Sequence, residues 1–117
     1  MSGHVIISHG LESGPDASKA AALARAAAAL GWTHERPDYR DLDVLGPLGD
    51  VAGRILRLGA RAHLCERRPL VLAGSSMGAY ISAHVSREIH VDGLFLMAPP
   101  IALDAEPRYL KAAMVPT

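Results

Sequence analysis

The sequence predicts an α/β fold of three layers, in which helices cover both faces of an open parallel sheet of four strands. Apolar, often β-branched runs alternate along the chain with segments that have helical periodicity, in the order βαβαβαβ. Crossovers between parallel strands are almost always right-handed, and this order therefore places helices on the two faces of the sheet. The length of 117 residues and the absence of repeats predict a single domain over residues 1–117.

The first half of the chain contributes two strands and one helix. Residues 4–10 form a short β-branched run that is typical of a buried strand. An alanine-rich helix is expected to begin at Pro15 or Asp16, where a missing or spare N–H costs nothing, and to end at Gly31 as a left-handed cap. The residues expected on its buried face are Leu23, Ala27 and Leu30. Residues 32–39 are polar and contain Pro37, which indicates a weaker strand near a sheet edge.

The second half repeats the alternation after a loop over residues 41–49 that contains Gly46 and Pro47. A helix over residues 51–65 is indicated by apolar residues at spacings of four and three, namely Val51, Ile55, Leu58, Ala62 and Cys65. The remaining elements are expected at residues 69–73 (strand), 77–89 (helix), 92–98 (strand, stopped by two prolines) and 106–113 (a short helical piece).

The connectivity predicts where a site would form. If the first strand is central, the strand order is 2-1-3-4 and the topological switch lies between the first and third strands. Ligands of open α/β sheets bind at that point, beyond the carboxyl ends of the strands. Two glycine-containing loops meet there, one at His9-Gly10 and one at residues 74–78.

The loop at residues 74–78 has the sequence Gly-Ser-Ser-Met-Gly and joins an expected strand to an expected helix. The pattern G-x-S-x-G in this context is typical of a nucleophile elbow, which presents a serine hydroxyl at the tip of a sharp turn. Gly74 and Gly78 suit such a turn because a Cβ atom at either position would collide where strand and helix backbones approach. The pattern therefore indicates Ser76 as an attacking residue, and the alternative is a Gly/Ser-rich turn that merely closes a βα unit.

Four segments together resemble the α/β-hydrolases, and among them the small bacterial hydrolases without a lid. The matching segments are residues 8–15 (SHGLESGP), 37–39 (PDY), 74–78 (GSSMG) and 96–100 (LMAPP), which cover essentially the whole chain in the family's order. The resemblance implies acyl transfer with Ser76 as nucleophile and an oxyanion hole formed by the backbone N–H groups of Met77 and Leu11. It also implies that His9 and Gly10 support the oxyanion loop, and it implies no cofactor.

The rest of a catalytic triad departs from the family's pattern. The family's order is serine, acid, histidine, but no histidine follows His90. Asp104 is the candidate acid, with a solvated loop or a helix N-cap as the alternative, and Glu106 would also fit. His9 is the one histidine expected beside the crevice, where a structural role is favoured over that of a base. His84 lies about 12 Å along the elbow helix at 1.5 Å per residue, too far to serve Ser76.

The missing triad residues lead to a prediction about the whole chain. The fourth strand would be an apolar sheet edge, which favours pairing or aggregation. The chain is therefore expected to be a fragment of a longer hydrolase or, less favoured, an oligomer that self-associates through this edge.

Composition narrows the function classes. Twelve basic and twelve acidic side chains give a formal net charge of zero, so no global field recruits nucleic acid or an anionic membrane. Four arginines, Arg54, Arg57, Arg61 and Arg68, are interpreted as a solvated helix face. The single cysteine, the lack of a visible signal peptide and the lack of a long apolar stretch favour a soluble cytoplasmic protein.

Several kinds of site are not expected. No His/Cys/Asp cluster has metal-ligand spacing, and neither glycine loop has the pattern of a nucleotide-binding loop. The favoured function is a serine hydrolase acting on small ester, thioester or amide substrates. The alternatives are a catalytically silent binding module and an inactive truncated fragment.

Overall fold

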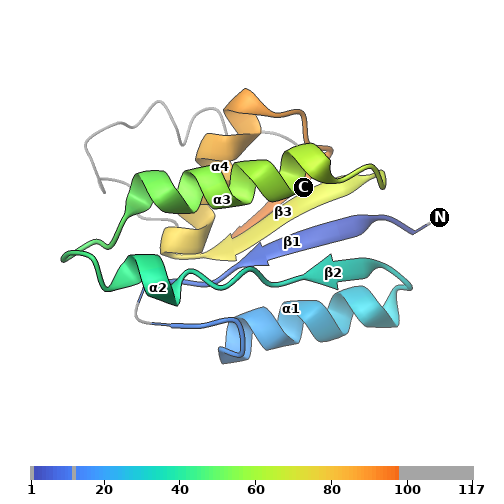
Figure 1. Ribbon diagram of the computed structural model, residues 1–117. Helices are drawn as coiled ribbons and strands as arrows, with labels where there is room; N and C mark the ends of the chain where they lie inside the picture. The colour runs from blue at the N-terminus through green and yellow to red at the C-terminus, as the bar shows by residue number, and fades with distance from the viewer. Residues whose placement is uncertain (1, 12, 98–117) are drawn as a thin grey trace.

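The computed structural model describes residues 2–11 and 13–97, and these residues form one parallel sheet with helices on both faces (Figure 1). The elements are β1 (His4–Ser8), α1 (Ser18–Ala29), β2 (Thr33–Glu35), α2 (Arg40–Asp43), α3 (Val51–Leu64), β3 (Leu70–Ser75), α4 (Met77–Glu88) and β4 (Gly93–Met97). The strand order is β2-β1-β3-β4, and every pairing is parallel, which confirms the predicted order 2-1-3-4.

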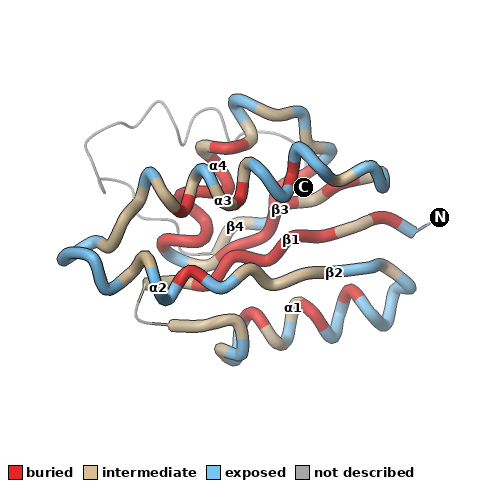
Figure 2. Tube along the Cα trace, viewed as in Figure 1, coloured by how far each residue is buried: buried red, intermediate tan, exposed pale blue. Residues whose placement is uncertain are grey.

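Two apolar clusters, one on each face, hold the layers together. The larger lies between the sheet and helices α3 and α4, and includes Ile6, Leu58, Leu72 and Ile81, each fully buried. The smaller lies under α1, where the short side chains of Ala20, Ala24 and Ala27 let the helix approach the sheet closely. Figure 2 shows the central strands β1 and β3 almost entirely buried and β2 largely exposed at its edge.

Three expectations about the elements need correction. Helix α1 begins at Ser18, with Ala17 as its N-cap, rather than at Pro15 or Asp16. Leu30 is 74% exposed, because the helix buries its alanine face instead. The expected loop over residues 41–49 contains a short helix, α2, at its start. By contrast Gly31 adopts φ 78°, as a left-handed cap requires.

The apolar stripe of α3 is confirmed, since Leu58 and Ala62 are fully buried and Val51, Ile55 and Cys65 pack against the larger cluster. No helix among the described residues is long and apolar enough to span a bilayer. The expected stop at Pro99-Pro100 and the helical piece over residues 106–113 lie outside the described residues.

Candidate active site

The turn between β3 and α4, where the sequence predicts a nucleophile elbow, is a sharp strand-to-helix turn. Ser76 adopts φ 56° and ψ −118°, and among the described residues it alone has a positive φ without being glycine. Such a conformation costs about 1–3 kcal/mol and persists only where the surrounding structure enforces it. The Ser76 side chain is exposed, does not cap α4, and makes no hydrogen bond to a described residue. Within the described part of the chain, the hydroxyl is therefore without a hydrogen-bond partner.

Gly74 and Gly78 permit this turn at two points of close backbone approach. A Cβ atom on Gly74 would overlap the backbone of Gly78, which confirms the predicted close approach of strand and helix. A Cβ atom on Gly78 would overlap the carbonyl group of Ser8, at the end of the neighbouring strand β1. The elbow is thus packed against β1 as well as against its own strand.

The loop after β1 passes directly beside the serine. A Cβ atom on Gly10 would lie 3.5 Å from the Cβ atom of Ser76 and 3.3 Å from the carbonyl oxygen of Ser75. Leu11 follows in the same loop, and Met77 is the first residue of α4. Neither the Leu11 nor the Met77 amide donates a hydrogen bond to another residue in the described part of the chain. Leu11 thus follows directly on a residue that lies beside Ser76, Met77 is adjacent to Ser76 in the chain, and neither N–H is bonded to another described residue.

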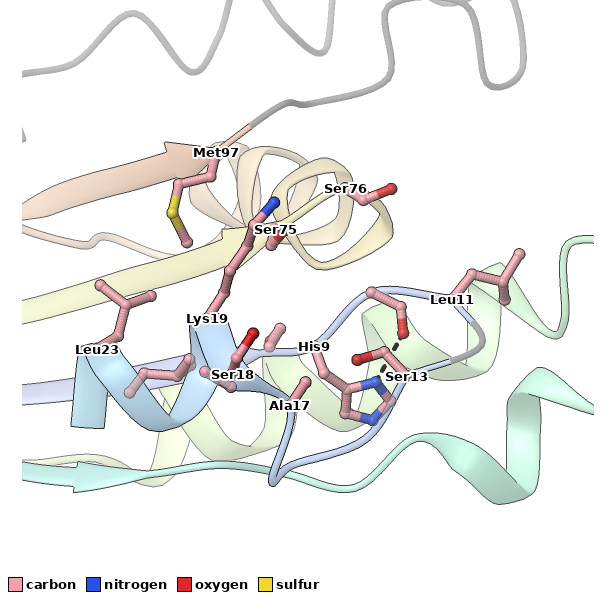
Figure 3. Close-up of a pocket in the computed structure, with 14 residues that line it drawn as sticks. His9, Leu11, Ser13, Ala17, Ser18, Lys19, Leu23, Ser75, Ser76 and Met97 are labelled. Carbon is pink, nitrogen blue, oxygen red and sulfur yellow. Dashed lines mark hydrogen bonds between the residues drawn. The ribbon is translucent and has the colours of Figure 1, made fainter. Parts of the chain in front are cut away.

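A pocket of about 260 Å³ opens between this loop, the elbow and the start of α1 (Figure 3). Leu23 and Met97 form an apolar wall on one side, and the loop carrying His9 and Leu11 borders the other. Lys19 extends from α1 toward Ser75 and brings a positive charge to the rim. The pocket confirms that a cavity lies at the switch point between β1 and β3, with Ser76 in its lining.

His9 is buried below the pocket, and both of its ring nitrogens are engaged. Its Nε2 accepts the backbone N–H of Tyr39 at 2.9 Å, so Nδ1 carries the proton and donates it to the Gly10 carbonyl at 2.8 Å. Burial lowers the pKa of His9 below its ordinary 6.5, and the neighbouring Arg54 charge acts in the same direction. A neutral imidazole that joins the loop at Gly10 to the backbone of Tyr39 fits the predicted supporting role of His9 better than the role of a base.

Arg54 contradicts the interpretation of the four arginines as a solvated face. Its side chain is fully buried and forms a two-pronged ion pair with Asp43 of α2, with N–O distances of 2.7 Å. Sequence reasoning missed it, although Arg54 lies four residues before Leu58 and so on the apolar stripe of α3. The exposed arginines of the group contact Glu35 and Asp92, while half-buried Arg57 pairs with Asp41.

Other predicted site residues are not brought to the pocket. Among the described histidines, only His9 lines it; His4 bonds to Thr33 and Glu35, and His34 and His63 are exposed. Asp104, the candidate acid, and Glu106 lie outside the described residues. No cluster of three or more His, Cys, Asp or Glu side chains suited to a metal ion occurs among the described residues.

No family model matches the chain, and no curated protein matches it. A solved structure from Xanthomonas campestris pv. campestris, of a protein assigned to the alpha/beta superfamily of hydrolases, matches 90% of the chain with 55% identity and a TM-score of 0.84. A second, of an alpha-beta serine hydrolase homologue from Coxiella burnetii, matches 86% with 28% identity and a TM-score of 0.69.

The chain spans 63% of the length of the first of these proteins and 52% of the second. The parallel sheet of order β2-β1-β3-β4, with helices on both faces, agrees with the fold of these hydrolase structures. The sheet order, the turn and the similarity to these two structures together show that the chain belongs to the α/β-hydrolase superfamily.

Proposed function

We propose that this chain carries the nucleophile and the oxyanion hole of a serine hydrolase that acts on small ester, thioester or amide substrates. The observation that carries the proposal is the backbone of Ser76. A φ of 56° at a serine is unfavourable, and Gly74 and Gly78 are fitted to hold it there. Packing alone gives no reason for this strain, because a glycine at position 76 would relieve it. The strain is explained if the turn serves to present the Ser76 hydroxyl to a substrate.

The proposed chemistry follows from the groups around the hydroxyl. Ser76 Oγ attacks the substrate carbonyl carbon, its proton passes to a general base, and the negative charge moves onto the carbonyl oxygen. The N–H groups of Met77 and Leu11 stabilise that oxyanion; losing one such donor typically costs about 10²–10³-fold in rate. The leaving group departs with a proton, and water then hydrolyses the acyl-enzyme. Because both nitrogens of His9 are engaged, we expect the base to come from outside the described residues, with Asp104 as the candidate acid.

The test is the intact mass of the protein after exposure to a fluorophosphonate probe. An activated serine forms a P–O bond to the probe with loss of fluoride, so one adduct per chain is expected. Ser76→Ala should abolish the adduct. Ser75→Ala is the matched control, because Ser75 lines the same pocket and precedes the nucleophile by one residue. An adduct that survives in Ser76→Ala, or no adduct on the protein from its native source, would overturn the proposal.

Protein from its native source matters because its mass also reports whether the natural chain is longer than 117 residues. The alternative, a binding module without turnover, predicts saturable ligand binding and no Ser76 adduct. The observation that favours this alternative is that both ring nitrogens of His9 are engaged in hydrogen bonds, so His9 does not act as a base.

A further inference from the structure

Arg54 makes contacts beyond its ion pair, and its hydrogen bonds to carbonyl groups both reach the loop after β1. Its Nη1 donates to the carbonyl oxygen of His9 at 2.7 Å, and its Nη2 donates to the carbonyl oxygen of Gly10 at 3.1 Å. Its guanidinium also lies over the ring of Tyr39, 4.6 Å from the centroid. A single buried side chain from α3 thus binds two successive carbonyl groups of the loop that borders Ser76.

Because the peptide group is planar, these contacts also determine the direction of the Leu11 N–H. In a trans peptide the carbonyl and the following N–H point in opposite directions. The Gly10 carbonyl points toward Arg54, so the N–H of Leu11 points away from Arg54. The α-carbon of Gly10 lies on the elbow side, as the 3.5 Å separation between a Cβ built on Gly10 and the Ser76 Cβ indicates. Arg54 therefore holds the Gly10–Leu11 peptide in one orientation, with the Leu11 N–H directed away from the guanidinium.

His9 acts on the same carbonyl, because its Nδ1–H donates to Gly10 at 2.8 Å. The Gly10 oxygen thus accepts two hydrogen bonds, one of them from a cation. Hydrogen bonds in series polarise one another, so a carbonyl bound to a guanidinium makes the N–H of its own peptide a better donor. The arrangement both orients and strengthens the Leu11 amide.

The energetics of Arg54 favour a role beyond stability. A buried ion pair is weak evidence for a stabilising function, since apolar residues of similar volume often serve as well or better. Arg54 is fully buried and Asp43 has a side chain only 8% exposed, so desolvation of both charges is nearly complete. Arginine offers several donors in a rigid fork, which lets one side chain serve Asp43 and two carbonyl groups together.

We propose that Arg54, held in place by Asp43, is a positioning residue that fixes the Gly10–Leu11 peptide so that the Leu11 N–H faces the oxyanion formed at Ser76. This inference rests on the proposed function. Arg54 does not touch the substrate in this scheme and acts through the loop. Its removal should therefore lower the rate of reaction at Ser76 with little effect on the binding of the probe.

The first experiment separates rate from binding in the full chain. The rate constant and the apparent affinity for phosphonylation of Ser76 are measured for the wild type, Arg54→Lys and Asp43→Asn. Lysine keeps the charge, but its three donors on one atom cannot reproduce the four hydrogen bonds that the rigid guanidinium makes to Asp43 and the two carbonyl groups. Because a misplacement of about 1 Å can cost about 10²-fold, we expect a rate at least about 10-fold lower in Arg54→Lys, with affinity changed less than about threefold. Asp43→Asn should show a smaller loss in the same direction.

Arg57→Met is the matched control. Arg57 lies three residues further along α3, is half-buried, and pairs with Asp41 through the same kind of two-pronged contact. Its rate constant should equal that of the wild type. All rates are compared at temperatures where circular dichroism shows each variant folded. If Arg54→Lys does not fold, Asp43→Asn carries the comparison.

The second experiment determines the orientation of the Gly10–Leu11 peptide directly and does not depend on activity. Crystal structures of the wild type and Arg54→Lys, or of Asp43→Asn if Arg54→Lys does not fold, should differ in the orientation of the Gly10–Leu11 peptide, which is expected to flip or to occupy two orientations. An unchanged peptide, or a rate loss equal to that of Arg57→Met, would overturn the inference. Absence of a Ser76 adduct on the wild type would instead overturn the proposed function and the catalytic part of this inference, while the peptide orientation would still decide the structural part.

Discussion

Gly78→Ala should be the most damaging single methyl addition in the elbow. An alanine Cβ at this position would lie 2.6 Å from the carbonyl carbon of Ser8 and 2.9 Å from the carbonyl oxygen of His9. Favourable contacts between heavy atoms lie at about 3.5–4.0 Å, so each of these is too short by roughly 0.6 Å or more. Both neighbours are backbone atoms at the end of the central strand β1. No side-chain rotation can relieve the overlap.

The cost follows from what must move. Helix α4 would have to shift away from β1, which would open its buried face, including Met77, Ile81 and Val85. Overpacking of a core typically costs about 1–3 kcal/mol, and two rigid backbone contacts place this substitution at the upper end, about 3 kcal/mol. Since domains of this kind have about 5–15 kcal/mol of stability in total, the loss should be large but measurable.

Urea denaturation is the assay, followed by the fluorescence of Trp32, which is partly buried against the α1 cluster. With m-values of about 1–3 kcal/mol per molar urea, the midpoint should fall by about 1–3 M. Gly59→Ala is the matched control on α3. Its Cβ would meet only the Ile89 Cδ1 atom, at an ordinary 3.7 Å, so helix propensity should raise stability by about 0.5–1 kcal/mol. The reasoning is refuted if Gly78→Ala loses less than about 0.5 kcal/mol or if Gly59→Ala loses as much.

Three further outcomes are expected from the same region. Ser76→Gly should raise the unfolding free energy by about 1 kcal/mol, because glycine tolerates φ 56°, whereas Ser76→Ala should not; equal melting temperatures would contradict this. Burial lowers the pKa of His9, so on acidification below pH 6.5 the unfolded chain binds a proton that the folded chain does not, and stability falls. The slope of unfolding free energy between pH 6.5 and 5, at most about 1.4 kcal/mol per pH unit for this group, should be shallower in His9→Gln. Tyr39→Phe leaves the buried Ser8 hydroxyl without its 2.9 Å partner and should cost about 1–3 kcal/mol, while adding Ser8→Ala should restore part of the loss in a double-mutant cycle.

The parts of the structure that could be predicted are those with local causes. The elbow is specified by five consecutive residues, and its glycines act within the turn and on the adjacent strand. The sheet order follows from the alternation of strands and helices together with the handedness of crossovers. For these features, each inference needed only neighbouring residues and a general rule.

The features that were missed depend on contacts between distant segments. Arg54 sits on the apolar stripe of α3, but its burial depends on Asp43 in α2, a helix that the sequence did not predict. Leu30 was placed on a buried face because it is apolar, whereas α1 buries alanines that let it lie close to the sheet. In both cases the burial of the side chain depends on the segment that packs against the helix. The periodic pattern of a single helix gives no information about that segment.

The packing of Gly78 against Ser8 also has a consequence for how the chain folds. The two loops of the site come from β1 and β3, whose register pairs His4 with Leu70, 66 positions apart in the chain. Closing so long a loop is slow compared with forming a local turn or helix. The strained geometry of Ser76 cannot exist before that closure, because β1 supplies part of its support. Reactivity at Ser76 should therefore appear late in refolding, together with β1–β3 pairing, and partly folded chains that contain α4 should carry an unreactive serine.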